Sequence, residues 1–336
     1  MLIGQPIDRR DGRQKITGGA RYAAEFSPPG VVHAVLVQST IGAGSVTGFD
    51  LGAARDMPGV LAIITTRNAL KLPGLTNKPN GQKQTSSHIV SAPLLQNGEL
   101  YYNGQHVAVA VADTLDRAIA AAEAVRPRYQ QGEAVTDMAA VLDQAYPPRD
   151  FRNGTRPPDS RRGDPDGAFA GAAVRVDATY ETPLEHHNPM EPHATVAAWQ
   201  GDRLTVWTAT QAISGAQGSM ATLFGIPHDN ITILCPFVGG GFGSKGNTWP
   251  PATLAAMAAR VVGRPVKLVL TRRQMYTSNG YRPRTIQKIR FGASVDGTLL
   301  SMRHDVISQT SPEVLGEFSE PSALATEMLY SCASVA

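Results

Sequence analysis

The stretch Val238-Gly239-Gly240-Gly241-Phe242-Gly243-Ser244-Lys245-Gly246 determines how the second part of this chain is interpreted. Five glycines surround one aromatic residue, and the apolar run 231–238 leads into them. Glycine lacks a Cβ and tolerates positive φ, so the backbone of such a loop can come close to a ligand. Residues 247–262 after the loop have the apolar spacing of a helix. The pattern predicts a strand, a glycine loop and a helix that together bind a ligand.

This loop has three simpler interpretations, one of which the sequence itself excludes. Residues 241–246 fit the dinucleotide pattern G-x-G-x-x-G, but that fingerprint needs an acidic residue about 20 positions later. The next expected strand, 266–270, is followed instead by Arg272 and Arg273, which leaves an NAD(P)-binding dehydrogenase domain as the weaker alternative. A P-loop is excluded because Gly246 follows Lys245 where Ser or Thr is required. A turn that only packs a helix on a strand is the third.

A histidine-rich segment at residues 185–193 raises the question of a metal site. Its three histidines and two glutamates are residue types that bind zinc. Its two prolines and the lack of i, i+4 spacing argue against a metal site, so none is predicted. We expect these histidines to make hydrogen bonds.

Composition limits the class of protein. Among the 336 residues, 42% are hydrophobic and 18% are charged, as in soluble globular proteins. The net charge of +3, without a dense Lys/Arg block, argues against nucleic acid as a partner. No apolar run approaches the ~20 residues of a membrane helix, and the N-terminus lacks the pattern of a signal peptide. A cytoplasmic location is expected, or a periplasmic one if an exported partner subunit carries the chain.

The two cysteines, Cys235 and Cys332, bear on electron transfer. They cannot supply the four thiolates that an iron–sulfur cluster usually takes. Any such cluster is therefore expected on a partner chain.

The predicted fold class is α+β, in two parts. Residues 146–167 are dense in Pro, Gly, Arg and Asp and predict a linker between a first domain, 1–145, and a second, 168–336. In the first domain we expect strands at 31–37, 60–64 and 106–111, and a helix at 113–125 capped by Asp113. In the second we expect strands at 173–180, 194–199 and 203–208, a helix at 214–224 ending at Gly225, and a hairpin of 286–295 with 299–307 around Asp296-Gly297.

Several segments, taken in order, resemble the molybdopterin-binding subunit of the xanthine dehydrogenase/aldehyde oxidase family. Residues 11–22 are similar to its opening D-G-x-x-K-x-T-G-x-A-x-Y, and residues 104–112 to its G-Q-x-V-A-x-V-x-A. Met190-Glu191-Pro192-His193 resembles M-E-P-H, and Thr208-Ala209-Thr210-Gln211 resembles T-x-x-Q. The glycine loop resembles G-G-G-F-G-G-K, with Ser244 in place of one glycine. The resemblance covers essentially the whole chain.

The resemblance implies an α/β hammerhead domain followed by the first part of a molybdopterin-binding domain. It also implies an oxidoreductase that hydroxylates aldehydes or N-heterocycles with oxygen from water. The cofactor would be molybdenum-molybdopterin, in bacterial members often the cytosine dinucleotide form. Electrons would pass to [2Fe–2S] clusters and FAD on partner subunits.

The matching residues receive roles by the same resemblance. The amide of Gln211 and the loop residues Gly240, Gly241, Phe242 and Gly243 would hold the cofactor. Phe242 would also wall the substrate pocket, with core packing as the alternative role. Gly246 stands where purine-oxidising members carry a glutamate, which favours an aldehyde over a purine.

The resemblance leaves the catalytic residue unassigned in this chain. Members of the family are longer, and their catalytic glutamate lies in the part that corresponds to positions beyond residue 336. Either a separate chain supplies this C-terminal half, or the chain is a truncated, non-catalytic fragment or interaction module.

Overall fold

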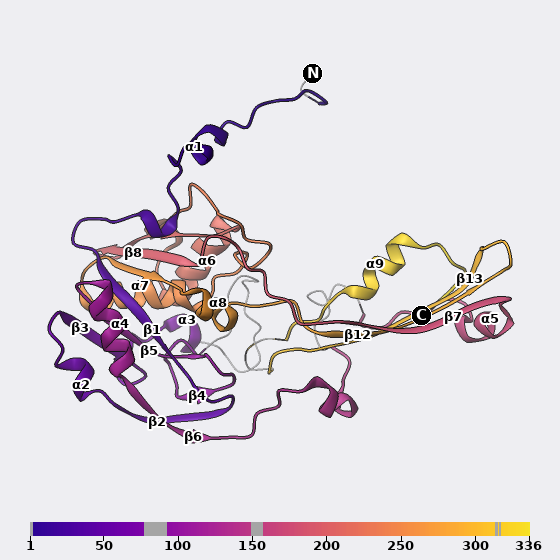
Figure 1. Ribbon diagram of the computed structural model, residues 1–336, viewed down its shortest axis with the longest axis horizontal. Coiled ribbons are helices and arrows are strands. Elements are labelled where there is room, and N and C mark those ends of the chain that lie inside the picture. The colour runs from indigo at the N-terminus through magenta and orange to yellow at the C-terminus, as the bar shows by residue number, and fades with distance from the viewer. Residues whose placement is uncertain (1–2, 77–92, 149–156, 313–314, 316) are drawn as a thin grey trace. The chain divides into compact units, whose positions relative to one another are not determined.

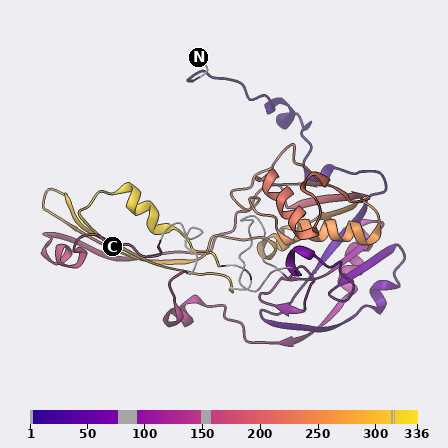
Figure 2. The same ribbon diagram turned by 180° about the vertical axis from the view of Figure 1, so that it is seen from behind.

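The computed structural model describes residues 3–76, 93–148, 157–312, 315 and 317–336. Residues 149–156 of the predicted linker lie outside this range. The chain forms two compact units, Met1–Ala134 with His187–Gly280 and Val135–His186 with Tyr281–Ala336. Each unit combines helices with a sheet (Figures 1 and 2), in agreement with the predicted α+β class.

A mixed seven-stranded sheet forms the centre of the first unit. Its strand order is β10-β9-β8-β11-β1-β5-β3. The strands β1 and β11 pair in parallel, with Val32 opposite Val266, so early and late parts of the sequence share one sheet. The strands are β1 (Val32–Gln38), β3 (Val60–Thr65), β5 (His106–Ala112), β8 (Ala194–Gln200), β9 (Arg203–Thr208), β10 (Ile231–Leu234) and β11 (Val266–Val269).

Every residue of strand β5 is buried, because both faces of the sheet are covered there. Val109 and Val111 belong to a core cluster that includes residues of α7 (Pro250–Val262). Ala108 and Ala110, which point to the other face, pack in a second cluster with Ala121 of α4 (Leu115–Ala124). The unbroken apolar run of this strand is typical of one enclosed on both sides.

Smaller elements complete the first unit. A three-stranded sheet has the order β4-β2-β6. Its strands are β2 (Gly44–Asp50), β4 (Glu99–Leu100) and β6 (Arg126–Gln131), and the remaining helices are α1 (Gly12–Ile16), η1 (Ala23–Glu25), α2 (Gly52–Arg55), α3 (Pro73–Thr76), α6 (Ile213–Phe224), η4 (His228–Asn230) and α8 (Arg272–Ser278).

Two helix starts differ from the sequence prediction. Helix α4 begins at Leu115, so its N-cap is Thr114 and not Asp113. The Thr114 hydroxyl accepts a hydrogen bond from the Arg117 N–H at 3.3 Å. Asp113 instead pairs with the Arg117 side chain at 2.6 Å. Helix α7 begins at Pro250 rather than at residue 247, since proline suits the first helical turn and forces the preceding residue into an extended conformation.

The second unit is built on a four-stranded sheet of order β14-β13-β12-β7. Strands β12 and β13 form the predicted hairpin, and Gly297 in its turn has a φ of 87°. Helix α5 packs on one face, where Arg290 lies over the Phe169 ring. The elements are η2 (Met138–Gln144), α5 (Pro165–Gly171), β7 (Val174–Thr182), β12 (Thr285–Ala293), β13 (Leu299–Ser308), α9 (Ser322–Leu329) and β14 (Ser334–Val335).

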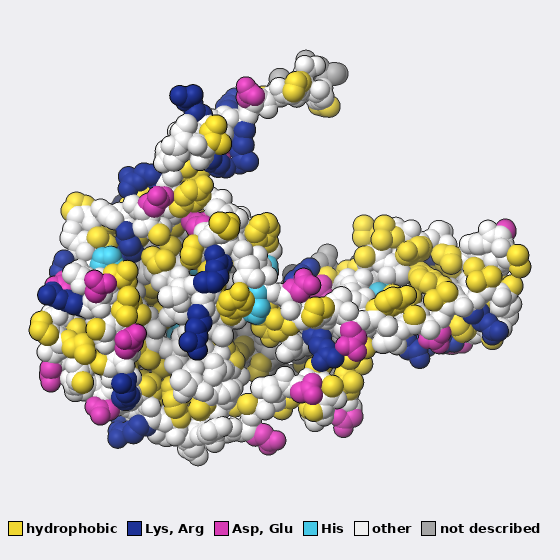
Figure 3. Space-filling view, in the orientation of Figure 1, with side chains coloured by type: hydrophobic (Ala, Val, Ile, Leu, Met, Phe, Trp, Pro, Cys, Tyr) yellow, Lys and Arg dark blue, Asp and Glu magenta, His cyan; other side chains and the backbone are white. Residues whose placement is uncertain are grey.

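The surface of the second unit carries hydrophobic side chains on and around α9 (Figure 3). Met328 and Leu329 of this helix are strongly exposed. In the part of the chain that the structure describes, no helix has both the length and the apolar character to cross a membrane.

The buried histidine of β5 makes the stability of the fold depend on pH. Burial lowers the pKa of His106 to about 4, and its Nε2 lies 2.9 Å from the Ser278 hydroxyl. Below pH 6.5 the unfolded chain binds a proton that the folded chain does not take up until about pH 4. Above pH 6.5 His106 therefore does not lower the free energy of unfolding. As the pH falls below 6.5, the free energy of unfolding decreases, by about 2 kcal/mol at pH 5.

We expect urea unfolding at pH 7 and pH 5 to reveal this loss. His106→Gln should reduce the difference between the two pH values by about 2 kcal/mol. His228→Gln, at an exposed histidine, controls for removal of any histidine. An unchanged pH difference in His106→Gln would contradict the assignment.

Candidate functional site

The glycine loop follows strand β10, and three of its residues have positive φ. These are Gly240 at 90°, Phe242 at 53° and Gly243 at 93°. The Ser244 N–H donates to the Gly241 carbonyl at 2.8 Å, which closes a turn around Phe242. Phe242 is the one of these three that is not glycine, and positive φ in a bulky residue is a conformation to examine for function.

Gln211, which follows β9, is hydrogen-bonded to the backbone of the loop. Its Oε1 accepts from the N–H groups of Gly243 at 3.0 Å and Lys245 at 3.2 Å. Its own N–H donates to the Lys245 carbonyl at 2.8 Å. Gln211 is exposed, and its Nε2 has no hydrogen-bond partner among the described residues. The side chain therefore anchors the loop with its oxygen and retains two N–H donors for another group.

Gln211 and the loop residues predicted for the site therefore lie together, but their N–H groups differ in whether they have a partner. The amide of Gly243 is engaged by Gln211. Within the described parts of the chain, the amides of Gly240, Gly241 and Phe242 have no acceptor. These amides and Gln211 Nε2 form a set of neutral donors at one loop, which suits an oxo group or the edge of a pterin.

A buried ion pair below the loop was missed in the sequence. Lys245 Nζ lies 2.7 Å from Glu191 Oε2, and their side chains are 0% and 8% exposed. Lys245 Nζ also donates to the Glu191 carbonyl at 3.0 Å. Burial lowers the pKa of Lys245, while the Glu191 carboxylate opposes that shift. Because the ammonium is enclosed, it cannot contact a ligand as the lysine of a P-loop does.

Glu191 joins three distant segments that the sequence had marked separately. Its Oε2 also accepts from the Gly239 N–H at 2.7 Å. Its Oε1 accepts from the Ala23 N–H at 3.4 Å, and the neighbouring Tyr22 ring lies against Phe237. The opposite charges of the M-E-P-H and G-x-K segments were the signal that could have suggested this pairing.

His193 supports the same loop. Its Nε2 lies 3.1 Å from the Ser244 carbonyl, which fits the expectation that histidines of this segment make hydrogen bonds. Burial lowers the pKa of His193 to about 4, so the ring is neutral at pH 7. In the described part of the chain no three His, Cys, Asp or Glu side chains are grouped as metal ligands.

The two residues predicted for the substrate pocket lie at the loop surface. Phe242 is 72% exposed, so the alternative of core packing is wrong for this structure. Its ring lies close to Gly240, where an added Cβ would come within 3.2 Å of it. Gly246 is half-buried, and its N–H donates to the Gly243 carbonyl at 3.1 Å.

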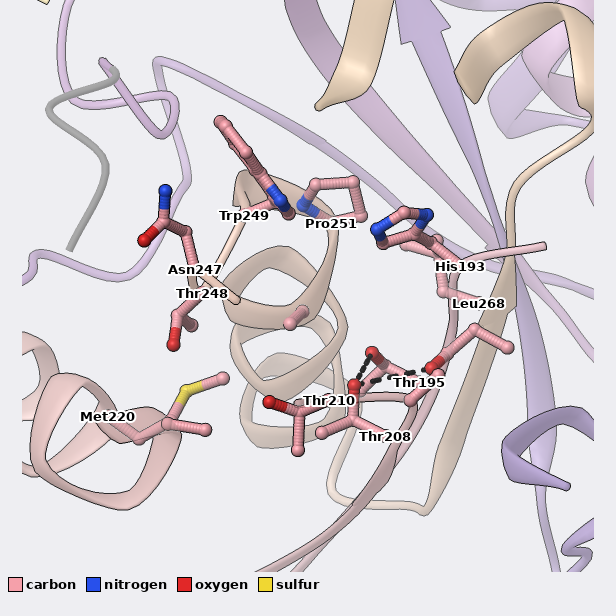
Figure 4. A pocket seen from close by; sticks show the side chains of 14 residues that line it. His193, Thr195, Thr208, Thr210, Met220, Asn247, Thr248, Trp249, Pro251 and Leu268 are labelled. Carbon is pink, nitrogen blue, oxygen red and sulfur yellow. Dashed lines mark hydrogen bonds between the residues drawn. The ribbon is translucent and has the colours of Figure 1, made fainter. Parts of the chain in front are cut away.

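A small cavity lies behind the loop, where α7 begins (Figure 4). Its volume of about 20 Å³ is enough for one water molecule and far too small for a cofactor. Thr195 and Thr208 on its wall are hydrogen-bonded to each other at 2.9 Å. A larger cleft of about 1100 Å³ in the second unit contains none of the predicted site residues. Neither cavity is lined by Gln211 or by residues 240–243, so the donors of the loop lie outside both.

Sheet topology argues against the dinucleotide-binding alternative. In a βαβ unit of that type, the strands before and after the helix lie parallel in one sheet, at or near neighbouring positions. Here β10 is at the edge of the sheet, and two antiparallel-paired strands, β9 and β8, separate it from β11. The helix also starts several residues after the glycines, at Pro250, so its N-terminus does not follow the loop directly.

Two protein families match most of this chain. Residues 17–133 match the family described as "Aldehyde oxidase and xanthine dehydrogenase, a/b hammerhead domain". Residues 147–335 match the "Molybdopterin cofactor-binding domain" family. The aldehyde oxidoreductase molybdenum-binding subunit PaoC of Escherichia coli (strain K12) is 38% identical over 336 residues, covering 99% of this chain and 43% of PaoC.

Solved structures agree on the fold. Quinoline 2-oxidoreductase from Pseudomonas putida 86 superposes with a TM-score of 0.76 at 25% identity, over 92% of this chain and 40% of that one. The aldehyde oxidoreductase from Desulfovibrio desulfuricans ATCC 27774 gives 0.79 at 22% identity, over 99% and 38%. The chain thus spans less than half the length of these relatives.

A substitution at Gly241 tests whether the loop holds a cofactor. Its φ is not positive, so the requirement for glycine here is contact: a Cβ would overlap the Gln211 side chain. We expect Gly241→Val to displace Gln211 and to lower molybdenum per chain at least about tenfold, as loss of a supporting contact does at metal sites. Metal analysis of the protein from cofactor-producing cells measures this.

Gly171→Val is the matched control, because a Cβ at Gly171 meets no atom within 4 Å. It should leave the molybdenum content unchanged. Normal molybdenum in Gly241→Val would show that this loop does not hold the cofactor.

Proposed function

The chain belongs to the xanthine dehydrogenase/aldehyde oxidase family of molybdopterin-binding subunits, and on this premise we propose that it forms part of a molybdenum hydroxylase. The proposed enzyme oxidises aldehydes, or N-heterocycles, with oxygen from water. The observation that carries the proposal is the set of unengaged N–H donors at Gln211 and the glycine loop. When bound, molybdenum-molybdopterin would supply the two-electron redox chemistry.

Some residues would donate hydrogen bonds to the cofactor, and others would position those donors. Nε2 of Gln211 and the amides of Gly240, Gly241 and Phe242 would donate to the cofactor. The amide of Gly243 acts indirectly, because it fixes the Gln211 oxygen and so aims the nitrogen outward. This set is neutral, since the buried Lys245 is balanced by Glu191. It therefore suits oxo and pterin acceptors better than a bare phosphate, which usually attracts an exposed lysine or arginine.

We propose an aldehyde as the substrate class. Phe242 presents an apolar ring at the exposed side of the loop, which suits contact with an aromatic or aliphatic aldehyde. Gly246 offers no carboxylate for hydrogen bonds to a purine. The name of PaoC, an aldehyde oxidoreductase subunit, supports the same class.

The assembly proposed around this chain includes an iron–sulfur subunit and an FAD subunit. The two cysteines of the chain are both free and far too few for a cluster of their own. The catalytic glutamate would come from the region that the longer relatives carry and this chain does not match. We further propose the cytosine dinucleotide form of the cofactor, a cytoplasmic location, and the domain division 1–145, 146–167 and 168–336.

Purification with its partner subunits tests the function. We expect the complex to contain molybdenum, to release a cytosine nucleotide on acid hydrolysis, and to oxidise aromatic aldehydes much faster than hypoxanthine. A guanine or no nucleotide would correct only the form of the cofactor. Stoichiometric NAD(P) in place of molybdenum would refute the proposal. A cofactor-free chain without partners would favour a non-catalytic interaction module.

Phe242 separates substrate binding from stability. Because the ring is exposed, Phe242→Ala should change the free energy of unfolding by less than about 0.5 kcal/mol. It should leave the molybdenum content intact and raise the KM for aromatic aldehydes more than for acetaldehyde. Urea unfolding, metal analysis and steady-state kinetics check the three effects. Equal KM changes for both aldehydes would argue against contact of the ring with substrate.

A further inference from the structure

Both ends of the glycine loop are fastened to one residue. At one end, Gly239 donates its N–H to Glu191 Oε2 at 2.7 Å and accepts from the Glu191 N–H at 3.0 Å. At the other end, Lys245 Nζ reaches Glu191 Oε2 at 2.7 Å and the Glu191 carbonyl at 3.0 Å. Residues 239–245 are therefore closed into a ring of contacts by a single glutamate.

Within the loop, two backbone hydrogen bonds support this shape, from Ser244 to Gly241 and from Gly246 to Gly243. Four of its residues are glycines, which have the largest conformational freedom to lose. Its one aromatic side chain, Phe242, is exposed and adds no packing within the core. A Cβ at Gly239 would press on the Glu191 side chain, so the loop fits tightly against its anchor. Without the anchor, the loop would be held only by these internal bonds and by Gln211 and His193, and we expect its amides to be less firmly fixed.

Fold stability alone gives no reason for charges at this place. The Lys245 side chain is fully buried and that of Glu191 nearly so, and hydrophobic residues of similar volume often replace such a pair without loss of stability. Hydrophobic residues could not bind the Gly239 N–H or the Glu191 carbonyl. What the pair provides beyond packing is directed hydrogen bonds to both ends of the loop.

We propose that Glu191 and Lys245 are positioning residues, which fix the glycine loop in the conformation that receives the cofactor. The inference rests on the proposed function in so far as the loop binds molybdopterin. Neither residue touches the cofactor itself, because both side chains are enclosed below the loop. Their effect passes through the amides of residues 239–243 and through Gln211, whose oxygen binds the Lys245 N–H.

The test is the double variant Glu191→Met/Lys245→Met, which removes both charges at similar volume and leaves no unpaired buried charge. Single variants would strand one buried charge and could fail to fold. Hydrogen exchange followed by mass spectrometry reads the loop directly, with or without cofactor. We expect the hydrogen-bonded amides of residue 239 and residues 243–246 to exchange at least about tenfold faster, while amides of β5 are unchanged.

Molybdenum per chain, from metal analysis of the complex, is the second measurement. It should fall at least about tenfold in the double variant, while the melting temperature stays within a few degrees of the wild type. Lys267→Met is the matched control, since the hydrogen bond of Lys267 to Ser27 is exposed and lies away from the loop. It should alter neither the exchange of residues 239–246 nor the molybdenum content.

The outcomes separate this inference from the proposed function. Wild-type exchange and wild-type molybdenum in the double variant would overturn the positioning role and leave the proposed function standing. Faster exchange with wild-type molybdenum would also overturn it, because the loop shape would then not govern loading. A wild-type complex without molybdenum would overturn the proposed function and this inference with it. Faster exchange together with lost molybdenum, at a retained melting temperature, supports the positioning role.

Discussion

The Glu191 carboxylate pairs with the Lys245 ammonium and accepts hydrogen bonds from the N–H groups of Gly239 and Ala23. Together with Glu191 itself, these partners belong to three segments that lie far apart in the sequence. A buried carboxylate with several donors is stable only if all of them stay in place, because an unpaired charge in the interior is costly. The N-terminal segment, the M-E-P-H segment and the glycine loop are thus held in one arrangement, on which the rest of the site depends.

Enclosing the charges also sets the electrostatic character of the site. The Lys245 ammonium is buried and paired with Glu191, so the donors without a partner in the described loop are neutral N–H groups. Gln211 adds to this set, because its oxygen is occupied by Gly243 and Lys245 and its nitrogen remains a donor. Such a surface selects for polarised oxygen and nitrogen acceptors rather than for total negative charge.

The sheet of the first unit explains how a loop late in the chain depends on early residues. Strand β1 pairs with β11, and β5 and β3 continue the sheet beyond it. Residues from both sides of the predicted linker therefore share a hydrophobic core, which includes Val109 of β5 and Met257 of α7. Spatial units and sequence domains need not coincide where strands of two domains join edge to edge, as β1 and β11 do here.

Local signals in the sequence determined the individual elements: the alternation in 194–199 and 203–208, the Asp296-Gly297 turn, and Gly225, which ends α6 in the left-handed conformation with a φ of 64°. The sequence also marked Gln211 and the glycine loop as partners through the motifs that surround them. Only the tertiary structure decided that Glu191 pairs with Lys245, that Phe242 is exposed, and that β11 lies beside β1. The physical reason is range: propensity and turn chemistry act between neighbours in sequence, whereas pairing and burial depend on which distant segments the core brings together.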